Sequence, residues 1–332
     1  MSETAPVSVT VDVHARALLQ SFQVSHLTTE TVDVVRLRLT EPGGAVSGEG
    51  EISADAGYGQ DGQAIAREAR GLAAALAADP RIGDPAHLEG QLEKAAAEVS
   101  ACALTLVEMA FLDRAARCAG VPVWRLVGLP DPGVVRLMTT VPIGAEPPAA
   151  GPMKIKLGGP GDRALLRRLT RVTGPVILDV NLGWDRAGWL AVRDLVAEVA
   201  PAVLEDPVSD PSLLAEVRAA LPRTRVVLDE GIGSQADVEY AARAAQGANV
   251  KVMKLGGLFP ARRALEFLGR HGATRMLGCF LEPPTAIAYA AQLNGLADWT
   301  DLDGHFWLSP DHPPVPEFRL DDSAPGVPRI AA

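Results

Sequence analysis

Four of the five lysines in this chain lie in two similar stretches. Residues 153–159 read MKIKLGG and residues 250–257 read VKVMKLGG, whereas most of the other positive charges are arginines. A lysine amine acts as a base near neutral pH only where a neighbouring charge or burial lowers its pKa. The concentration of lysine in these two stretches therefore predicts amines that transfer protons.

Three carboxylates end short apolar runs between the two lysine stretches. Asp179 ends VILD, Glu205 ends AVLE and Asp229 ends VVLD. Carboxylates that converge repel one another, and a divalent cation relieves this repulsion. Ligation by oxygen alone favours Mg2+, or Mn2+ in its place, over zinc. A lone Asp at a strand end often caps the next helix, but three carboxylates in successive units favour a metal site.

The charged residues recur at the period of a strand–helix unit. The apolar runs end 23, 26, 24 and 22 residues apart, at Lys156, Asp179, Glu205, Asp229 and Lys251. Continuous apolar strands that alternate with helical stretches are typical of a buried parallel sheet. The pattern predicts the α/β class, with every charged residue at the carboxyl end of its strand.

Three further β-like segments complete the set of strands. One precedes the run at Lys156 and two follow Lys251: VVRLMTT (134–140), RMLGCFLE (275–282) and DWTDLDG (298–304). Eight units predict a modified (β/α)8, TIM-like barrel, whose chemistry lies at the carboxyl ends of the strands. Only IGAEPPAAGP separates the first two strands, which is too short and too rich in proline for a helix. We therefore predict a helix-less first crossover.

The second and sixth strands of such a barrel face each other across its mouth. Lys154 and Lys156 share one side of the second strand, and Lys251 ends the sixth. With a substrate carboxylate on the cation, an amine on one face removes the α-proton and an amine on the other face returns one, through an enediolate. Asn181, two residues after Asp179, is placed to orient a ligand. The predicted reaction is a 1,1-proton transfer that inverts the α-carbon.

The chain before the barrel has a different pattern. The stretch 32–39 is rich in β-forming residues and leads into the glycine-rich EPGGAVSGEGE, as in a hairpin, and helical spacing follows. We predict an α+β capping domain over residues 1–128 and a barrel domain over residues 129–312.

Composition restricts the partners. A net charge of −10 argues against nucleic acid, because phosphate binding needs a basic face. There is no apolar run of 18 residues, no signal-peptide pattern, and no cysteine spacing for disulfides or zinc. We expect a cytoplasmic homo-oligomer that acts on a small molecule and binds no membrane.

The motifs in this order resemble the enolase superfamily. Residues 106–128 are similar to the end of the capping domain of that family, and KIK, LDVN, LEDP, LDE and VKVMKLGG follow. Lysines on both the second and the sixth strand resemble the muconate-lactonizing subgroup. The resemblance implies that Lys156 and Lys251 are the catalytic pair, that Lys154 supports Lys156, and that the segment 313–332 returns to the capping domain.

The TDLDG stretch carries a more specific resemblance. It places Asp301 and Asp303 on the eighth strand, and such a D-x-D is similar to that of the dipeptide epimerases, where it binds the substrate's α-ammonium. This implies a dipeptide substrate, inverted at the α-carbon of its C-terminal residue. Residues 21–33 resemble the family loop that covers the substrate. They contain no Arg or Lys, so Phe22 indicates an apolar pocket, with His26 available for polar contact.

Three alternatives stay open. An N-acylamino-acid racemase, an o-succinylbenzoate synthase or a muconate cycloisomerase belongs to the same subgroup, but its substrate lacks the ammonium that Asp301 and Asp303 would bind. A metal-independent barrel aldolase would use a Schiff-base lysine on the sixth strand. A non-catalytic barrel would leave the set of lysines and carboxylates without a purpose. The sequence favours a Mg2+-dependent dipeptide epimerase.

Overall fold

A curved antiparallel sheet forms the first part of the chain. The computed structural model describes residues 7–308 and 310–331. The sheet has the order β1–β2–β3, formed by β1 (Ser8–Gln23), β2 (Thr28–Thr40) and β3 (Val46–Ala54). Strands β2 and β3 pair across the glycine-rich turn, with Thr40 opposite Val46, which confirms the predicted hairpin.

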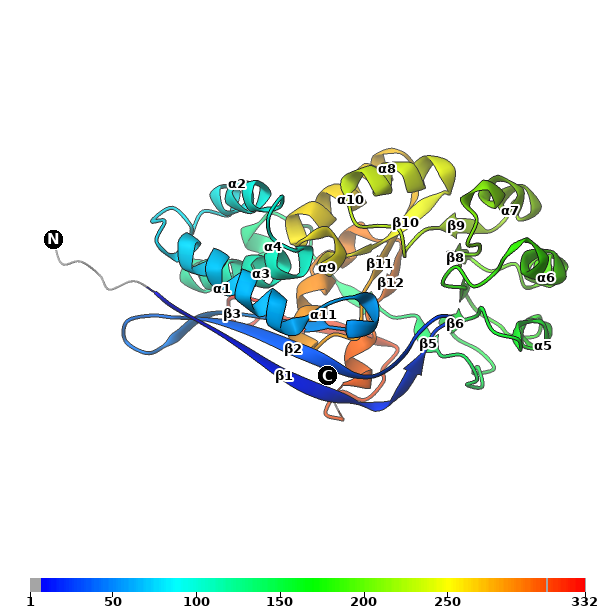
Figure 1. Cartoon of the computed structure of the whole chain (residues 1–332), viewed down its shortest axis with the longest axis horizontal. Helices are drawn as coiled ribbons and strands as arrows, with labels where there is room; N and C mark the ends of the chain where they lie inside the picture. The colour runs from blue at the N-terminus through cyan, green and yellow to red at the C-terminus, as the bar shows by residue number, and fades with distance from the viewer. Residues whose placement is uncertain (1–6, 309, 332) are drawn as a thin grey trace.

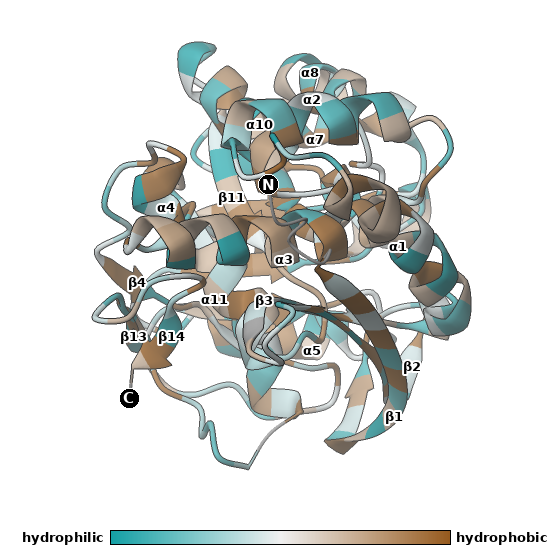
Figure 2. Ribbon diagram, turned by 90° about the vertical axis from the view of Figure 1, so that its left-hand side faces the viewer, coloured by the Kyte–Doolittle hydropathy of each residue, from teal (hydrophilic) through white to brown (hydrophobic). Residues whose placement is uncertain are grey.

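The helices of the capping side pack on this sheet. They are η1 (Ala56–Tyr58), α1 (Gly62–Ala77), α2 (Pro85–Ala95), α3 (Ala101–Ala119) and α4 (Val123–Leu126). Helix α3 crosses β3 closely because Gly48 and Gly50 carry no side chain. A Cβ on Gly50 would lie 2.5 Å from the backbone oxygen of Leu106. Figure 2 contrasts the largely hydrophobic α3 with the more hydrophilic outer helix α2.

Eight parallel strands form the barrel. They are β5 (Thr139–Val141), β6 (Met153–Lys156), β7 (Val176–Asp179), β8 (Val203–Glu205), β9 (Arg225–Val227), β10 (Gly247–Lys251), β11 (Thr274–Gly278) and β12 (Trp299–Asp301). Hydrogen bonds order them as β5 to β9 and β10 to β12. A parallel bridge between Leu228 and Ala248 joins the two groups, and Met138 N donates to Thr300 O at 3.2 Å to close the ring. The predicted barrel is confirmed.

Helices surround most of the barrel (Figure 1). They are α5 (Asp162–Leu169), α6 (Arg186–Val199), η2 (Pro211–Leu213), α7 (Leu214–Ala220), α8 (Gln235–Ala244), α9 (Val252–Leu255), α10 (Leu258–Arg270), α11 (Pro284–Ala291), η3 (Asn294–Leu296) and η4 (Gly304–Trp307). Residues 142–152, between β5 and β6, form turns without a helix, so the helix-less crossover is confirmed. Within the described ranges, no helix is both long and apolar enough to cross a membrane.

The first predicted barrel strand was wrong in its extent. The segment 134–140 is two strands. β4 (Val134–Arg136) joins a separate sheet with β13 (Glu317–Asp321) and β14 (Arg329–Ala331), and only β5 belongs to the barrel. Leu137 N donates to Pro316 O at 2.9 Å whereas Met138 N turns to the barrel. The C-terminal segment therefore divides the run, and the domain boundaries at residues 128 and 312 stay a prediction.

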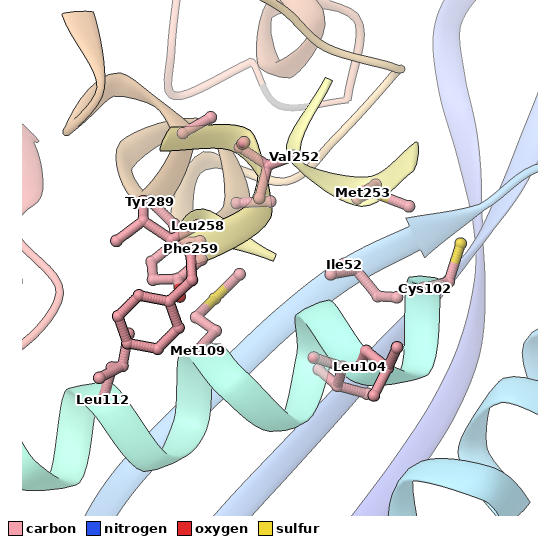
Figure 3. Close-up of a cluster of buried hydrophobic side chains, with 14 of the residues drawn as sticks. Ile52, Cys102, Leu104, Met109, Leu112, Val252, Met253, Leu258, Phe259 and Tyr289 are labelled. Carbon is pink, nitrogen blue, oxygen red and sulfur yellow. The ribbon is translucent and has the colours of Figure 1, made fainter. Parts of the chain in front are cut away.

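Helix α3 also ties the capping side to the barrel. Figure 3 shows its residues Met109 and Leu112 beside Leu258, Phe259 and Tyr289 of the barrel helices. All five side chains are buried. Removing a buried Leu or Met side chain typically costs about 2–5 kcal/mol. This packing fixes the capping side against the turn that follows β10.

Candidate active site

The predicted charged residues gather at the carboxyl ends of the barrel strands. Lys156 ends β6 opposite Asp179 at the end of β7, and Asp179 in turn lies opposite Glu205 at the end of β8. Lys251 ends β10, and Asp301 ends β12. All five side chains are buried. The parallel register therefore converts residues far apart in sequence into one cluster.

Lys154 lies inside a ring of carboxylates. Its Nζ is 2.9 Å from Asp179 Oδ2, 3.0 Å from Glu205 Oε2 and 2.7 Å from Asp301 Oδ2. Burial alone would lower the pKa of Lys154, but these carboxylates outweigh it and hold the pKa well above its usual value. Lys154 is therefore an ammonium that binds the carboxylates together, and it shares Asp179 Oδ2 with Lys156.

Lys156 shares one carboxylate oxygen with Lys154 and also reaches Asn181. Its Nζ is 2.6 Å from Asp179 Oδ2 and 3.4 Å from Asn181 Oδ1. The amide of Asn181 also donates to Glu230 Oε1 at 3.0 Å. Asn181 thus connects the β6 lysine to the loop after β9.

Two lysines converge on Asp229 from the opposite side. Lys251 Nζ is 2.7 Å from Asp229 Oδ2 and Lys254 Nζ is 2.9 Å from Asp229 Oδ1. The sequence alone had assigned no role to Lys254. The short helix α9 starts immediately after Lys251, and a helical turn returns the residue three positions on to the same side.

The three predicted metal ligands show the electrostatics of a cation site. Burial and the charge of Asp179 raise the pKa of Glu205 to about 8. At Asp179 and Asp229, the charge of the neighbouring lysines outweighs the effect of burial. It lowers the pKa of Asp179 and holds that of Asp229 well below its usual range. Glu205 Oε2 and Asp229 Oδ2 are buried and accept no well-aligned hydrogen bond. These features fit Mg2+, which takes oxygen ligands.

Lysine ammonium groups contact all three of these carboxylates. Within residues 7–308 and 310–331, no three Asp, Glu, His or Cys side chains form a ready cage for a metal. Burial lowers the pKa of Lys251, but Asp229 and Glu230 outweigh it and hold the pKa well above its usual value. The sequence had predicted a lowered lysine pKa. A cation on the carboxylates would cancel the charge that now raises it.

Asp301 and Asp303 both face the cavity but have different partners. Asp301 Oδ2 pairs with Lys154, and its Oδ1 accepts from Thr140 Oγ1 at 3.3 Å. Asp303 lies beyond β12, and its Oδ2 accepts from Thr140 N at 3.0 Å. Burial and Asp301 raise the pKa of Asp303 to about 7. Lys154 pairs with Asp301, whereas no ion pair to Asp303 is found among the described residues, so a cation bound beside Asp303 would favour its ionised form.

The cavity combines charged and apolar walls. Its charged and polar lining is formed by Lys154, Lys156, Asn181, Lys251, Asp301 and Asp303. Its aromatic and aliphatic lining is formed by Phe22, Val24, Leu27, Tyr58, Phe280 and Trp307. The ring centroids of Phe22 and Trp307 are 4.8 Å apart. His26 is exposed and does not line the cavity, and its ring stands edge-on to Tyr58 instead.

Several residues of this region were missed by the sequence analysis. Asn249 Nδ2 donates to Glu205 Oε1 at 2.8 Å, and the Asp206 carboxylate accepts from the Asp229 and Glu230 amides. Asp206 and Glu230 immediately follow predicted ligands, so their position was an available signal. Phe280 and Trp307 gave none, because in sequence their apolar side chains cannot be told from core residues.

A barrel with charged strand ends beneath an α+β cap defines a class of enzymes that act on small molecules inside the barrel mouth. Family models for the "Mandelate racemase / muconate lactonizing enzyme, N-terminal domain" and the "Enolase C-terminal domain-like" fold match residues 7–128 and 150–328. The chain belongs to this family, in the muconate-lactonizing subgroup of the enolase superfamily, and it is an enzyme.

Named relatives support this placement. A "Hydrophobic dipeptide epimerase" of Roseobacter litoralis is 32% identical over 65% of this chain and 68% of its own length. One of Citrifermentans bemidjiense is 34% identical over 68% and 70%. The solved dipeptide epimerase of Enterococcus faecalis, crystallised with Mg and L-Leu-L-Tyr, has a TM-score of 0.83 at 21% identity, with 99% and 100% of the chains covered. These relatives are all isomerases.

Proposed function

We propose that this enzyme epimerises dipeptides with apolar side chains at the α-carbon of the C-terminal residue. One observation carries the proposal: Lys156 and Lys251 reach a single cavity from β6 and β10, on opposite sides of the barrel mouth. Two amines on opposite faces of one carbon suit removal of a proton from one face and its replacement from the other. The result is inversion.

The three carboxylates would fix the position of a cation beside the substrate. Mg2+ held by Asp179, Glu205 and Asp229 would supply positive charge against the enediolate oxygens of the substrate. Either Lys156 or Lys251, as a neutral amine, takes the α-proton, and the other, as an ammonium, donates a proton to the opposite face. The set of atoms is unchanged, because one proton leaves the carbon and one arrives. Lys154 holds three carboxylates in place throughout.

The walls of the cavity support an apolar dipeptide. Asp303, with Asp301 beside it, faces the substrate's α-ammonium, and Phe22, Leu27 and Phe280 surround its side chains. An acidic or basic side chain would be buried among these groups without an opposite charge, which is costly. The names of the two curated relatives and the L-Leu-L-Tyr of the E. faecalis structure agree with this preference.

The test is deuterium uptake by a panel of L,L-dipeptides in D2O with Mg2+. Apolar dipeptides should gain one deuteron at the C-terminal α-carbon together with the inverted epimer. Lys156→Ala and Lys251→Ala should each abolish epimerisation. In each variant the remaining amine should still exchange the α-proton of the one epimer whose α-proton faces it. Lys94→Ala is the matched control, because Lys94 is exposed on α2. Lack of exchange in every dipeptide would contradict the proposal.

A second candidate is racemisation of an N-acylamino acid. The ion pair between Asp301 and Lys154 favours it, because this aspartate is already neutralised without a substrate ammonium. An N-acetylated amino acid that exchanges faster than the dipeptides would identify this second reaction.

A further inference from the structure

The turn that joins β1 to β2 covers the cavity. In this covering turn, residues 24–27, Val24 N donates to Leu27 O at 2.9 Å, and both side chains line the cavity. Figure 1 shows the β1–β2 hairpin extending from the capping side to β5 and β6. The cavity measures about 50 Å³, whereas small-molecule pockets hold roughly 300–1,000 Å³. The covering turn must therefore lift to admit a dipeptide and close again over it.

Ser25 is the residue of the covering turn that hydrogen-bonds to the barrel. Its Oγ donates to Asn181 O at 2.8 Å. The barrel loops fit closely around it, since a Cβ on Gly158 would lie 2.6 Å from Ser25 Cβ and one on Gly183 would lie 3.2 Å from it. Gly158 also has a φ of +98°, which side chains rarely adopt. The loops after β6 and β7 thus leave room for this one side chain.

The residue that accepts this hydrogen bond also touches a catalytic amine. Asn181 has a φ of 45° and Leu182 a φ of 61°, and such left-handed backbone in residues other than glycine persists only where contacts fix it. The same Asn181 contacts Lys156 through its side chain. The covering turn and Lys156 therefore share one anchor, the backbone and side chain of Asn181.

We propose that Ser25 is a latch that holds the covering turn closed on Asn181 and thereby positions Lys156. It is a positioning residue, because Ser25 does not itself line the cavity and its hydroxyl acts through Asn181. The kinetic part of this inference rests on the proposed function, whereas the closure itself does not. Without the hydroxyl, the covering turn opens more often, and Asn181 loses one of the contacts that fix its backbone.

The direct test is hydrogen–deuterium exchange on the full chain in Mg2+ buffer without substrate. Loss of one neutral hydrogen bond should speed exchange of the segments around residues 24–27 and 181–183 by roughly 2- to 12-fold in Ser25→Ala. Exchange in the barrel strands should not change. Ser21→Ala is the matched control, because Ser21 is exposed on the same hairpin. Equal exchange of residues 24–27 in Ser25→Ala and wild type would overturn the latch.

A second variant approaches the latch from the barrel. Gly158→Ala should push Ser25 away and speed the same exchange, since its Cβ has no room. Gly161→Ala is its control, because Gly161 has open space around it and an ordinary φ of −87°. If Gly158→Ala leaves the covering turn as protected as Gly161→Ala does, Ser25 is not held where the structure places it.

The kinetic measurement separates the two proposals. In Ser25→Ala, kcat for an active apolar dipeptide should fall, because the bound enzyme spends less time closed with Lys156 in position, and Ser21→Ala should match wild type. Faster exchange with unchanged kcat would overturn the link to Lys156. If wild type turns over no dipeptide, the proposed function fails while the exchange result still decides the latch.

Discussion

Lys254 donates to Asp229 twice, at 2.9 Å to Oδ1 and at 2.7 Å to the backbone oxygen. Lys251 pairs with the other carboxylate oxygen. A predicted cation ligand therefore already lies between two ammonium groups, both largely buried. Lys251 and Lys254 together compensate the charge of Asp229. A cation bound to Asp229 would contribute to the same compensation.

Lys254→Met should destabilise the fold mainly when no cation is present. Leaving a buried charge without any partner costs roughly 3–5 kcal/mol, and the loss here should be smaller because Lys251 still pairs with Asp229. Mg2+ beside Asp229 should offset much of this loss. Urea unfolding in EDTA and in excess Mg2+ measures both values, with Lys94→Met as the control. An equal loss under both conditions would show that Asp229 binds no cation.

Glu108 should stabilise the junction between α3 and the barrel. Its Oε1 accepts from Tyr289 Oη at 2.7 Å and from the amide of Leu258 at the start of α10, and burial raises its pKa to about 7. Glu108→Ala leaves two buried donors unpaired, at about 1–3 kcal/mol each. Urea unfolding should show a loss of that order, and the exposed Glu98→Ala should show little. A negligible loss for Glu108→Ala would contradict the contact.

The strand ends were predictable because each combines an apolar run with one charged residue. Asp179 and Glu205 follow this rule, and the parallel register then places them opposite each other. Lys254 was missed because the rule treats the residues after a strand as a loop, whereas α9 begins at once. The segment 134–140 was misjudged because its division depends on pairing with β13, nearly two hundred residues later. Pairing between strands so far apart in sequence leaves no pattern in the local sequence.

The latch illustrates the same limit at the site. Nothing in SFQVSHL distinguishes Ser25 from Ser21 until the barrel loops are in place. Gly158 and Gly183 are informative only in three dimensions, where each makes room for a neighbour. His26 appeared the better polar candidate in sequence, yet the turn directs it outward.

His305 should make the fold less stable in mild acid. Burial and the neighbouring His312 lower its pKa to about 3, against an ordinary value of 6.5. Because the folded-state pKa is depressed, this stability is present above pH 6.5 and is lost progressively as the pH falls toward 3. From pH 7 to pH 5.5 the loss is about 1 kcal/mol. Urea unfolding of His305→Phe should lack this component, whereas the exposed His14→Gln should retain it. Identical pH dependence in His305→Phe would refute the assignment.

Asp303→Asn should separate substrate binding from catalysis. The amide oxygen still accepts from Thr140 N, but the negative charge that we propose meets the substrate's α-ammonium is lost. A hydrogen bond to a charged group contributes about 1.5–3 kcal/mol, so KM for a dipeptide should rise roughly 10- to 100-fold with kcat little changed. Asp301→Asn should also lower kcat, since it frees Lys154 from one of its three carboxylates.

The matched substrate is the same dipeptide with an acetylated amino group. Wild type should strongly prefer the free dipeptide, and Asp303→Asn should lose most of that preference, because the acetylated form never used the charge. Steady-state rates on both substrates give the ratio. A preference that survives in Asp303→Asn would place the ammonium elsewhere and would favour the racemisation of N-acylamino acids.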